Sequence, residues 1–219
     1  MGIKKNINIF FKIKTYIYFY TTKNIHNCKK FILGHFFAIF IKKFINNFLY
    51  GFLIKPYKLY CFIKNYFLHF CLFFLKNNLI FQFTTLSDIC VVDYPQRLKN
   101  RFYIVYVLLS TSFNIRLFLC LFVNNFIPLI SITRFYTSSN WLEREIWDMF
   151  GIKFLLHNDL RRILNDYGFH GYPLRKDFPL IGYIELRYDD LLQAVCIELV
   201  EIAQSFRFFK FENPWLNWR

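Results

Sequence analysis

The stretch RFYIVYVLLSTSFNIRLFLCLFV, residues 101–123, decides the fold. Its two halves, 102–109 and 115–123, are rich in β-branched and aromatic residues, which is typical of strands. The four residues TSFN at 111–114 lie between the halves and fit a hairpin loop. A third strand-like run at 89–94 comes before them, after which the segment PQRLKNR intervenes. The pattern predicts an antiparallel meander.

Upstream of this meander the sequence predicts helices. From residue 31 to 54 a phenylalanine recurs at every fourth position from Phe36, with Lys and Asn on the other side, which indicates an amphipathic helix. Lys55 and Pro56 end it, because the residue before a proline avoids the helical region. Residues 57–63 fit a short strand and 64–76 a second apolar helix. We therefore expect an α+β fold with helices packed on one face of a small, mostly antiparallel sheet.

Charge is distributed unevenly along the chain. Residues 1–87 contain 13 lysines and no arginine, aspartate or glutamate, whereas the remainder carries 15 basic and 14 acidic side chains. A basic arm of this kind is typical of contacts with nucleic acid or with an anionic membrane surface. The same part is drawn mainly from Lys, Asn, Ile, Phe and Tyr, whose codons are A/T-rich. Mutational bias in an A/T-rich, organellar genome is therefore a competing explanation.

The first 30 residues have a character of their own. Residues 5–19 alternate between apolar and polar side chains, which suits a strand but equally a poorly ordered extension. The first residues contain no arginine and so do not resemble a transit peptide. Synthesis inside an organelle would explain why no targeting sequence is present. We divide the chain into a lineage-specific extension at 1–30, an α+β domain at 31–138, and an interface segment with a short helix and an extended tail at 139–219.

Cysteine and hydropathy patterns favour neither a disulfide framework nor a membrane span. The six cysteines are scattered, with no C-x-x-C pair, and we expect reduced, mostly buried thiols. His26 with Cys28 and His69 with Cys71 come nearest to metal-ligand spacing, but neither pair has a partner pair, so we expect no metal site. The uncharged run at 117–133 is interrupted by two asparagines and a proline. We expect no transmembrane helix.

Residues 139–188 differ from everything before them. Acidic residues appear close to Arg and Lys, and Gly and Pro fall where turns are needed, which indicates an ordered and largely irregular surface. Asn140 followed by Glu143 fits a capping box that starts a helix at 141–149, with Gly151 at its end. A second short helix is expected at 159–164 and a strand at 183–188. A loop packed only on its own domain is the alternative to a surface that meets a partner.

The same segment carries a resemblance. It contains the words ERE at 143–145, DMFGI at 148–152, DLRRIL at 159–164, DYGF at 166–169 and PLRKDFPL at 173–180, preceded by VDYP at 92–95 and RFYIVY at 101–106. With these words in this order, the sequence resembles the family of the 30-kilodalton subunit of respiratory complex I, called NADH dehydrogenase subunit 9 when mitochondrially encoded. The chain has Leu156, Asn158 and Asn165 where that family usually has Gly, Pro and Thr.

The resemblance implies a place in NADH:ubiquinone oxidoreductase. It implies a subunit of the peripheral arm, in the quinone-reducing module on the matrix side of the mitochondrial inner membrane, beside the 49-kilodalton subunit and neighbouring iron–sulfur subunits. It also implies that FMN and the iron–sulfur clusters are held by partner subunits and that this chain, without a cofactor, supports electron transfer coupled to proton translocation. The sequence agrees, since it contains neither a cysteine set for a cluster nor a nucleotide-binding glycine motif.

Candidate interface residues follow from the charged words of this segment. Arginine and carboxylate side chains form bidentate pairs that fix geometry at a permanent interface. We expect no catalytic residue, and we hypothesise that Arg175→Ala impairs assembly of the peripheral arm rather than quinone affinity. Glu143 as a helix cap and Arg144 as a simple ion-pair partner are the alternatives. The ten candidates are Glu143, Arg144, Asp148, Asp159, Arg161, Arg162, Asp166, Arg175, Lys176 and Asp177.

Two rival functions concern the lysine-rich residues 1–87. They could bind RNA, as an organellar ribosomal protein would. They could instead contact the anionic membrane surface, which is compatible with a subunit of complex I.

Overall fold

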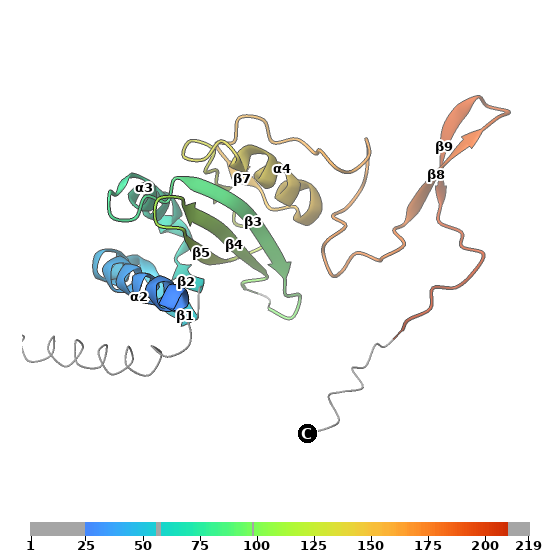
Figure 1. Cartoon of the computed structure of the whole chain (residues 1–219). Helices are drawn as coiled ribbons and strands as arrows, with labels where there is room; N and C mark the ends of the chain where they lie inside the picture. The colour runs from blue at the N-terminus through green and yellow to red at the C-terminus, as the bar shows by residue number, and fades with distance from the viewer. Residues whose placement is uncertain (1–24, 56–57, 98, 210–219) are drawn as a thin grey trace, which may run out of the picture. The chain divides into compact units, whose positions relative to one another are not determined.

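The computed structural model describes residues 25–55, 58–97 and 99–209 (Figure 1). The strand or extension expected at residues 5–19 lies outside this range. The chain separates into two compact units, residues 1–177 and residues 178–219. The helix and loops of 139–177 belong to the first unit, together with the expected α+β domain. Each unit is described by itself.

The first unit is built on a five-stranded sheet in the order β1-β2-β5-β4-β3. Its strands are β1 Leu49–Lys55, β2 Lys58–Ile63, β3 Thr85–Asp93, β4 Phe102–Ser110 and β5 Ile115–Val123. Neighbours pair antiparallel except β2 with β5, which are parallel. The predicted meander β3-β4-β5 is confirmed, and the turn after Ser110 ends on Asn114, which has a φ of 51°. Asparagine tolerates this left-handed conformation better than most residues.

Helices cover one face of this sheet. Along β4 the residues Phe102, Ile104, Tyr106 and Leu108 are fully buried and alternate with partly exposed neighbours, so only one face is closed. The closing residues come from α2 Ile25–Ile45, α3 Leu68–Asn77 and α4 Ser139–Phe150, which share a single apolar core with the sheet. The predicted α+β class, with helices on one face, is confirmed.

The helix predicted for residues 31–54 is too long. It ends at Ile45, a 3-10 turn follows at Asn46–Phe48, and Leu49–Lys55 pairs antiparallel with β2. The phenylalanine stripe misled the prediction, because Phe36 and Phe44 are half exposed while Phe37, Ile41 and Ile45 form the buried stripe. Pairing with a strand satisfies the backbone of β1, and its local periodicity does not reveal that partner.

Short elements complete the chain. A two-residue parallel pair joins β6 Leu129–Ile130 to β7 Phe154–Leu155. The helix expected at 159–164 is wrong, since these residues form neither helix nor strand. The second unit holds the hairpin of β8 Ile184–Asp189, which was predicted, and β9 Ala194–Leu199, which was not. None of the described helices is long and apolar enough to cross a membrane.

Two buried tyrosines allow a matched test of the core. The Tyr106 hydroxyl is fully buried without a hydrogen-bond partner among the described residues, whereas the Tyr136 hydroxyl donates to the Phe83 carbonyl at 2.7 Å. Removing an unsatisfied buried hydroxyl relieves a desolvation cost, so Tyr106→Phe should raise the free energy of unfolding by about 1 kcal/mol. Tyr136→Phe should lower it by about 1 kcal/mol. Urea unfolding of both variants checks this, and a loss of stability in Tyr106→Phe would contradict the assignment.

Candidate functional site

Helix α4 buries two carboxylates, Glu143 and Asp148, and the side chains of both are inaccessible to solvent. The predicted capping box is wrong. The N-cap is Ser138, which makes no side-chain capping bond, and Glu143 is turned into the core instead. Gly151 ends the helix with a φ of 73°, as predicted. A side chain at Gly151 would also collide at 2.6 Å with Arg175 and the Tyr172 ring, so both φ and space require glycine here.

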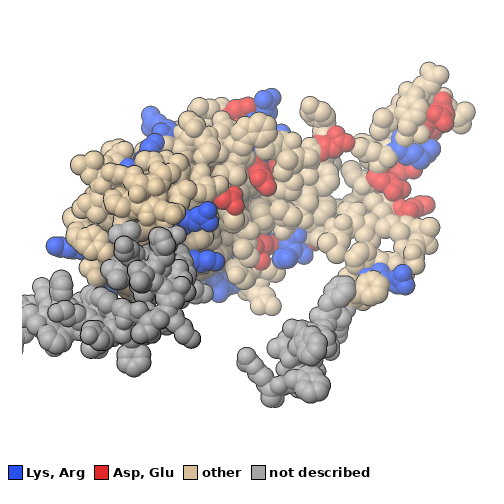
Figure 2. Space-filling view, viewed as in Figure 1, with Lys and Arg blue, Asp and Glu red and all other residues tan. Residues whose placement is uncertain are grey.

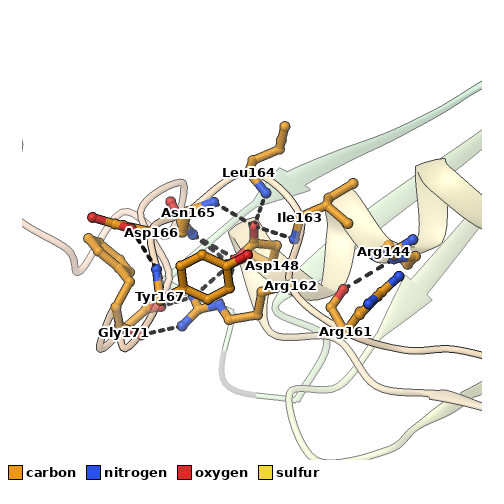
Figure 3. Close-up of polar contacts among 11 residues, drawn as sticks. Arg144, Asp148, Arg161, Arg162, Ile163, Leu164, Asn165, Asp166, Tyr167 and Gly171 are labelled. Atoms are coloured by element: carbon orange, nitrogen blue, oxygen red, sulfur yellow. Dashed lines mark hydrogen bonds and ion pairs between the residues drawn. The ribbon is translucent and has the colours of Figure 1, made fainter.

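The Asp148 carboxylate organises the loop that follows the helix (Figure 3). Its Oδ2 accepts the backbone N–H groups of Ile163, Leu164 and Asn165 at 3.2, 2.8 and 2.9 Å. Its Oδ1 accepts from the Arg162 Nε at 2.6 Å and from the Asn165 side-chain amide at 2.7 Å. Burial alone would raise the pKa of Asp148, but the backbone and Arg162 hydrogen bonds outweigh it and lower the pKa to about 2. The group is therefore charged at every physiological pH.

Arg162 extends this anchor across the loop. Its Nη1 and Nη2 donate to the carbonyls of Phe169 and Gly171, both at 2.5 Å. Its guanidinium also lies over the rings of Phe169 and Tyr172. One ion pair thus fastens residues 162–171 to α4 without any regular secondary structure.

The Glu143 carboxylate joins α4 to the strand β6 and its neighbours. It accepts from the Ser131 hydroxyl at 2.6 Å and from the Ile132 N–H at 2.8 Å. The Nε2 of His157 lies 3.8 Å away. Burial outweighs the two hydrogen bonds and raises the pKa of Glu143 to about 7. The pKa of Glu143 is therefore raised and that of Asp148 is lowered, although both residues lie on the same helix.

A second anchor holds residues 175–177 against the end of the sheet. Arg101 donates two hydrogen bonds to Asp93, at 2.6 and 2.7 Å, and pairs with Asp177 at 2.6 Å. The Lys176 N–H donates to the same Asp93 carboxylate at 2.9 Å. Burial would raise the pKa of Asp93, but these bonds lower it. The Arg175 Nε donates to the Phe150 carbonyl at 2.6 Å, which ties this segment to the last turn of α4.

The ten candidate interface residues fall into two groups. Four of them, Glu143, Asp148, Arg162 and Arg175, have partners inside the chain and hold its own segments in place. Arg144 is buried and lies over Trp141, which is itself two-thirds exposed. The remaining contacts with a partner subunit stay a prediction. The exposed candidates are Asp159 and Arg161, which pair at 3.0 Å, with Asp166, Lys176 and Asp177.

Sequence reasoning missed several residues of these anchors. Asp93 and Arg101 appeared only as parts of matching words, and Ser131, His157 and Asn165 carried no signal for the partners they have. The anchor contacts of these residues join positions from 8 residues apart, for Arg101 and Asp93, to 83 residues apart, for Lys176 and Asp93. A single sequence holds no pairing signal of that kind.

The arrangement fastens loops to α4 and to the end of the sheet. No group of three or more His, Cys, Asp or Glu side chains is placed to hold a metal ion within the part of the chain that the structure describes. Burial raises the pKa of the Cys71 thiol to about 12 and that of Cys61 well above its usual value, so both stay neutral. A cavity of about 470 Å³ exists elsewhere, lined by Tyr50, Gly51, Phe62, Asn65, Tyr66, Asn100 and Phe122.

Comparison with known proteins decides the family. Residues 63–184, which contain α4 and both anchors, match the family described as respiratory-chain NADH dehydrogenase, 30 Kd subunit. The chain belongs to this family. It is thus a 30-kilodalton complex I subunit by descent, and the resemblance noted from its sequence words is confirmed.

Individual members of the family are close in sequence. NADH-ubiquinone oxidoreductase subunit 9 of Reclinomonas americana is 52% identical over 141 residues, which is 64% of this chain and 69% of the relative. NADH dehydrogenase [ubiquinone] iron-sulfur protein 3 of Patellifolia webbiana is 53% identical over 142 residues, 65% of this chain and 73% of the relative. A chain of the membrane-bound sulfane sulfur reductase, an archaeal respiratory membrane complex, shares the fold, with a TM-score of 0.56 at 20% identity over 66% of this chain and 86% of that one.

Breaking the Asp148 anchor should release the loop it holds. In Asp148→Asn the amide cannot accept from five donors, so we expect a loss of about 2 kcal/mol in the free energy of unfolding. Trypsin should then cleave after Arg161 and Arg162 about tenfold faster, because local opening exposes the loop. Asp159→Asn, in an exposed ion pair, is the control and should change stability by less than about 0.5 kcal/mol. Equal cleavage rates in wild type and Asp148→Asn would contradict the anchor.

Glu143 should make stability fall as pH rises toward neutrality. Its pKa is raised from 4.5 to about 7, so the folded state binds the proton more tightly than the unfolded state does. The stabilisation is complete below about pH 4.5, declines between about pH 4.5 and 7 by about 3 kcal/mol in all, and levels off above. Glu143→Gln mimics the neutral form and should remove this slope. Glu145→Gln, exposed on the same helix, should retain it, and urea unfolding across that pH range distinguishes the two.

Proposed function

We propose that this chain is a structural subunit of the peripheral arm of mitochondrial complex I. It stands in the quinone-reducing module on the matrix side of the inner membrane and packs against the 49-kilodalton subunit. It holds no flavin and no cluster, and it supports NADH-to-ubiquinone electron transfer, coupled to proton translocation, by fixing the shape of its neighbours. Membership in the 30-kilodalton subunit family supports the assignment to the complex.

The observation that carries the structural role is how residues 159–177 are held. This segment has no helix or strand, yet the Asp148, Arg162, Asp93 and Arg101 side chains fix its backbone at many points. The side chains of Asp148, Arg162 and Asp93 bond backbone groups of this segment that regular secondary structure would otherwise pair. A rigid irregular surface can present charged residues such as Asp159 and Arg161 to a permanent partner in one geometry. Electron transfer between centres on other chains requires fixed distances of that kind.

The rival functions of residues 1–87 gain little from the comparisons. The RNA-binding alternative is not favoured, because the family match takes in residues 63–184. Contact of the lysine-rich part with a membrane surface remains compatible with the proposal.

The decisive experiment follows the endogenous protein through native electrophoresis. The chain should migrate with a megadalton-scale band that oxidises NADH, and depletion of the chain should remove that band. Migration with ribosomal particles instead would refute the proposal. Purified alone, the chain should hold neither flavin nor iron, and a tightly bound cofactor would contradict the non-redox role.

Arg175 separates assembly from quinone binding. Its guanidinium donates to the Phe150 carbonyl and lies over the rings of Tyr172 and Phe102. Arg175→Ala therefore weakens the attachment of the loop to α4 and leaves the Leu174 N–H bond to the Met149 carbonyl as the remaining backbone contact there. We expect the amount of assembled enzyme to fall by about tenfold, because a hydrogen bond from a charged group is lost, with an unchanged KM for quinone in what assembles. Arg175→Lys should also fail, because lysine lacks the planar fork. Exposed Arg134→Ala is the control. Normal assembly with altered quinone kinetics would contradict the structural role.

A further inference from the structure

The hairpin of the second unit is amphipathic. Its cross-strand pairs alternate between two faces, because successive side chains of a strand point to opposite sides. On one face Ile184 pairs with Leu199, Leu186 with Ile197 and Tyr188 with Val195. The other face pairs Glu185 with Glu198 and Arg187 with Cys196. All six residues of the first set, here called the apolar face, are exposed, from 36% for Ile184 to 75% for Leu199.

The opposite face cannot stabilise the hairpin by itself. Glu185 and Glu198 stand directly across from each other, and like charges in that position are unfavourable. Arg187 relieves the repulsion by binding Glu198 at 2.7 Å, but these side chains are largely solvated, and such pairs contribute little. A two-stranded sheet is marginal in water without a layer against it. The apolar face is therefore the part of the hairpin that needs a cover.

Charge identifies what kind of surface provides that cover. Residues 178–209 carry five acidic side chains, Glu185, Asp189, Asp190, Glu198 and Glu201, against two arginines. Figure 2 shows charged side chains of both signs on the hairpin beside uncharged ones. An anionic membrane surface attracts basic rather than acidic segments. A protein surface with an apolar centre and a basic rim matches both properties of the hairpin.

We propose that the apolar face of the β8–β9 hairpin docks on another subunit of the respiratory complex, at an apolar surface bordered by Lys or Arg side chains. The proposal rests on the function proposed above. It assigns the apolar centre of the contact to residues 184–199, a second attachment besides the charged loops of 159–177. The hairpin lies mostly beyond the family match, which ends at residue 184.

Adjacent residues of β9 provide a matched test. Ile197→Asp places a carboxylate in the apolar face, whereas Cys196→Asp places the same carboxylate on the opposite face, across from Arg187. An unpaired charge buried at an interface is costly, so Ile197→Asp should reduce the amount of this chain in the assembled complex by at least about tenfold. Cys196→Asp should stay within about twofold of wild type. Both variants are expressed as the full chain in the native host and quantified in the NADH-oxidising band.

Hydrogen exchange of the full chain supplies the second measurement. We expect the β8 and β9 amides to exchange rapidly in the isolated chain and slowly in the complex. Equal protection in both would show that the chain's own first unit covers the apolar face, which overturns the proposal. Equal incorporation of Ile197→Asp and Cys196→Asp would overturn it as well, while wild-type incorporation leaves the proposed function intact. A wild-type chain absent from the band would refute the proposed function itself.

Two other occupants are tested on the isolated chain. The first test is binding of the chain to phosphatidylcholine vesicles that contain cardiolipin. If Ile197→Asp abolishes this binding and Cys196→Asp retains it, the apolar face binds lipid. A dimer with the same dependence, measured by sedimentation, would assign it to a second copy. Either result overturns the proposal. A chain that is monomeric and does not bind the vesicles supports it.

Discussion

The compact unit depends on one buried carboxylate with five donors. Asp148 receives three backbone N–H groups and two side-chain donors, all from residues 162–165. Its burial would be expensive without them, and their N–H groups would be unsatisfied without it. The two requirements are met by the same contacts. A segment that has no helix or strand of its own is therefore held to the helix by five hydrogen bonds.

The number of donors explains why the two carboxylates of α4 differ. Asp148 has enough donors, one of them a guanidinium, to stay ionised, while Glu143 has two and its pKa rises to about 7. The two carboxylates of α4 therefore respond differently to pH. The anchor of residues 162–171 is independent of pH in the neutral range. The contact of α4 with Ser131 and Ile132 changes its protonation there, in a site that also faces His157.

The sequence predicts those parts of the fold that depend on local order. The meander is readable because its strands are adjacent in the chain and their turn contains Asn114, and the end of α4 is readable because only glycine suits the conformation of Gly151. Strand β1 was read as helix because its partner, β2, does not alter its own periodicity. Residues 159–164 look helical by composition, but the N–H groups of Ile163 and Leu164 donate hydrogen bonds to the Asp148 carboxylate instead of to carbonyls of a preceding helical turn.

The resemblance to the family indicated which segment holds the candidate site. It did not indicate which partners the charged side chains of that segment have. Charged words at 143–177 indicated an interface, yet Glu143 and Asp148 are inaccessible and act inside the chain. At two positions where the sequence departs from the family pattern, the structure shows how the different residue is accommodated. Leu156 has a φ of 60° where the family usually has glycine, a conformation that leucine rarely adopts. Asn165 stands where threonine is usual and adds a side-chain amide to the Asp148 carboxylate.

The words that identify the family are therefore, to a large extent, the fasteners themselves. Asp148, Arg162, Arg175 and Asp177 all lie in matching words, and each holds a segment distant in sequence. The buried Asp148 carboxylate is saturated by donors from the protein's own loop. These contacts hold the backbone of residues 163–165 against α4.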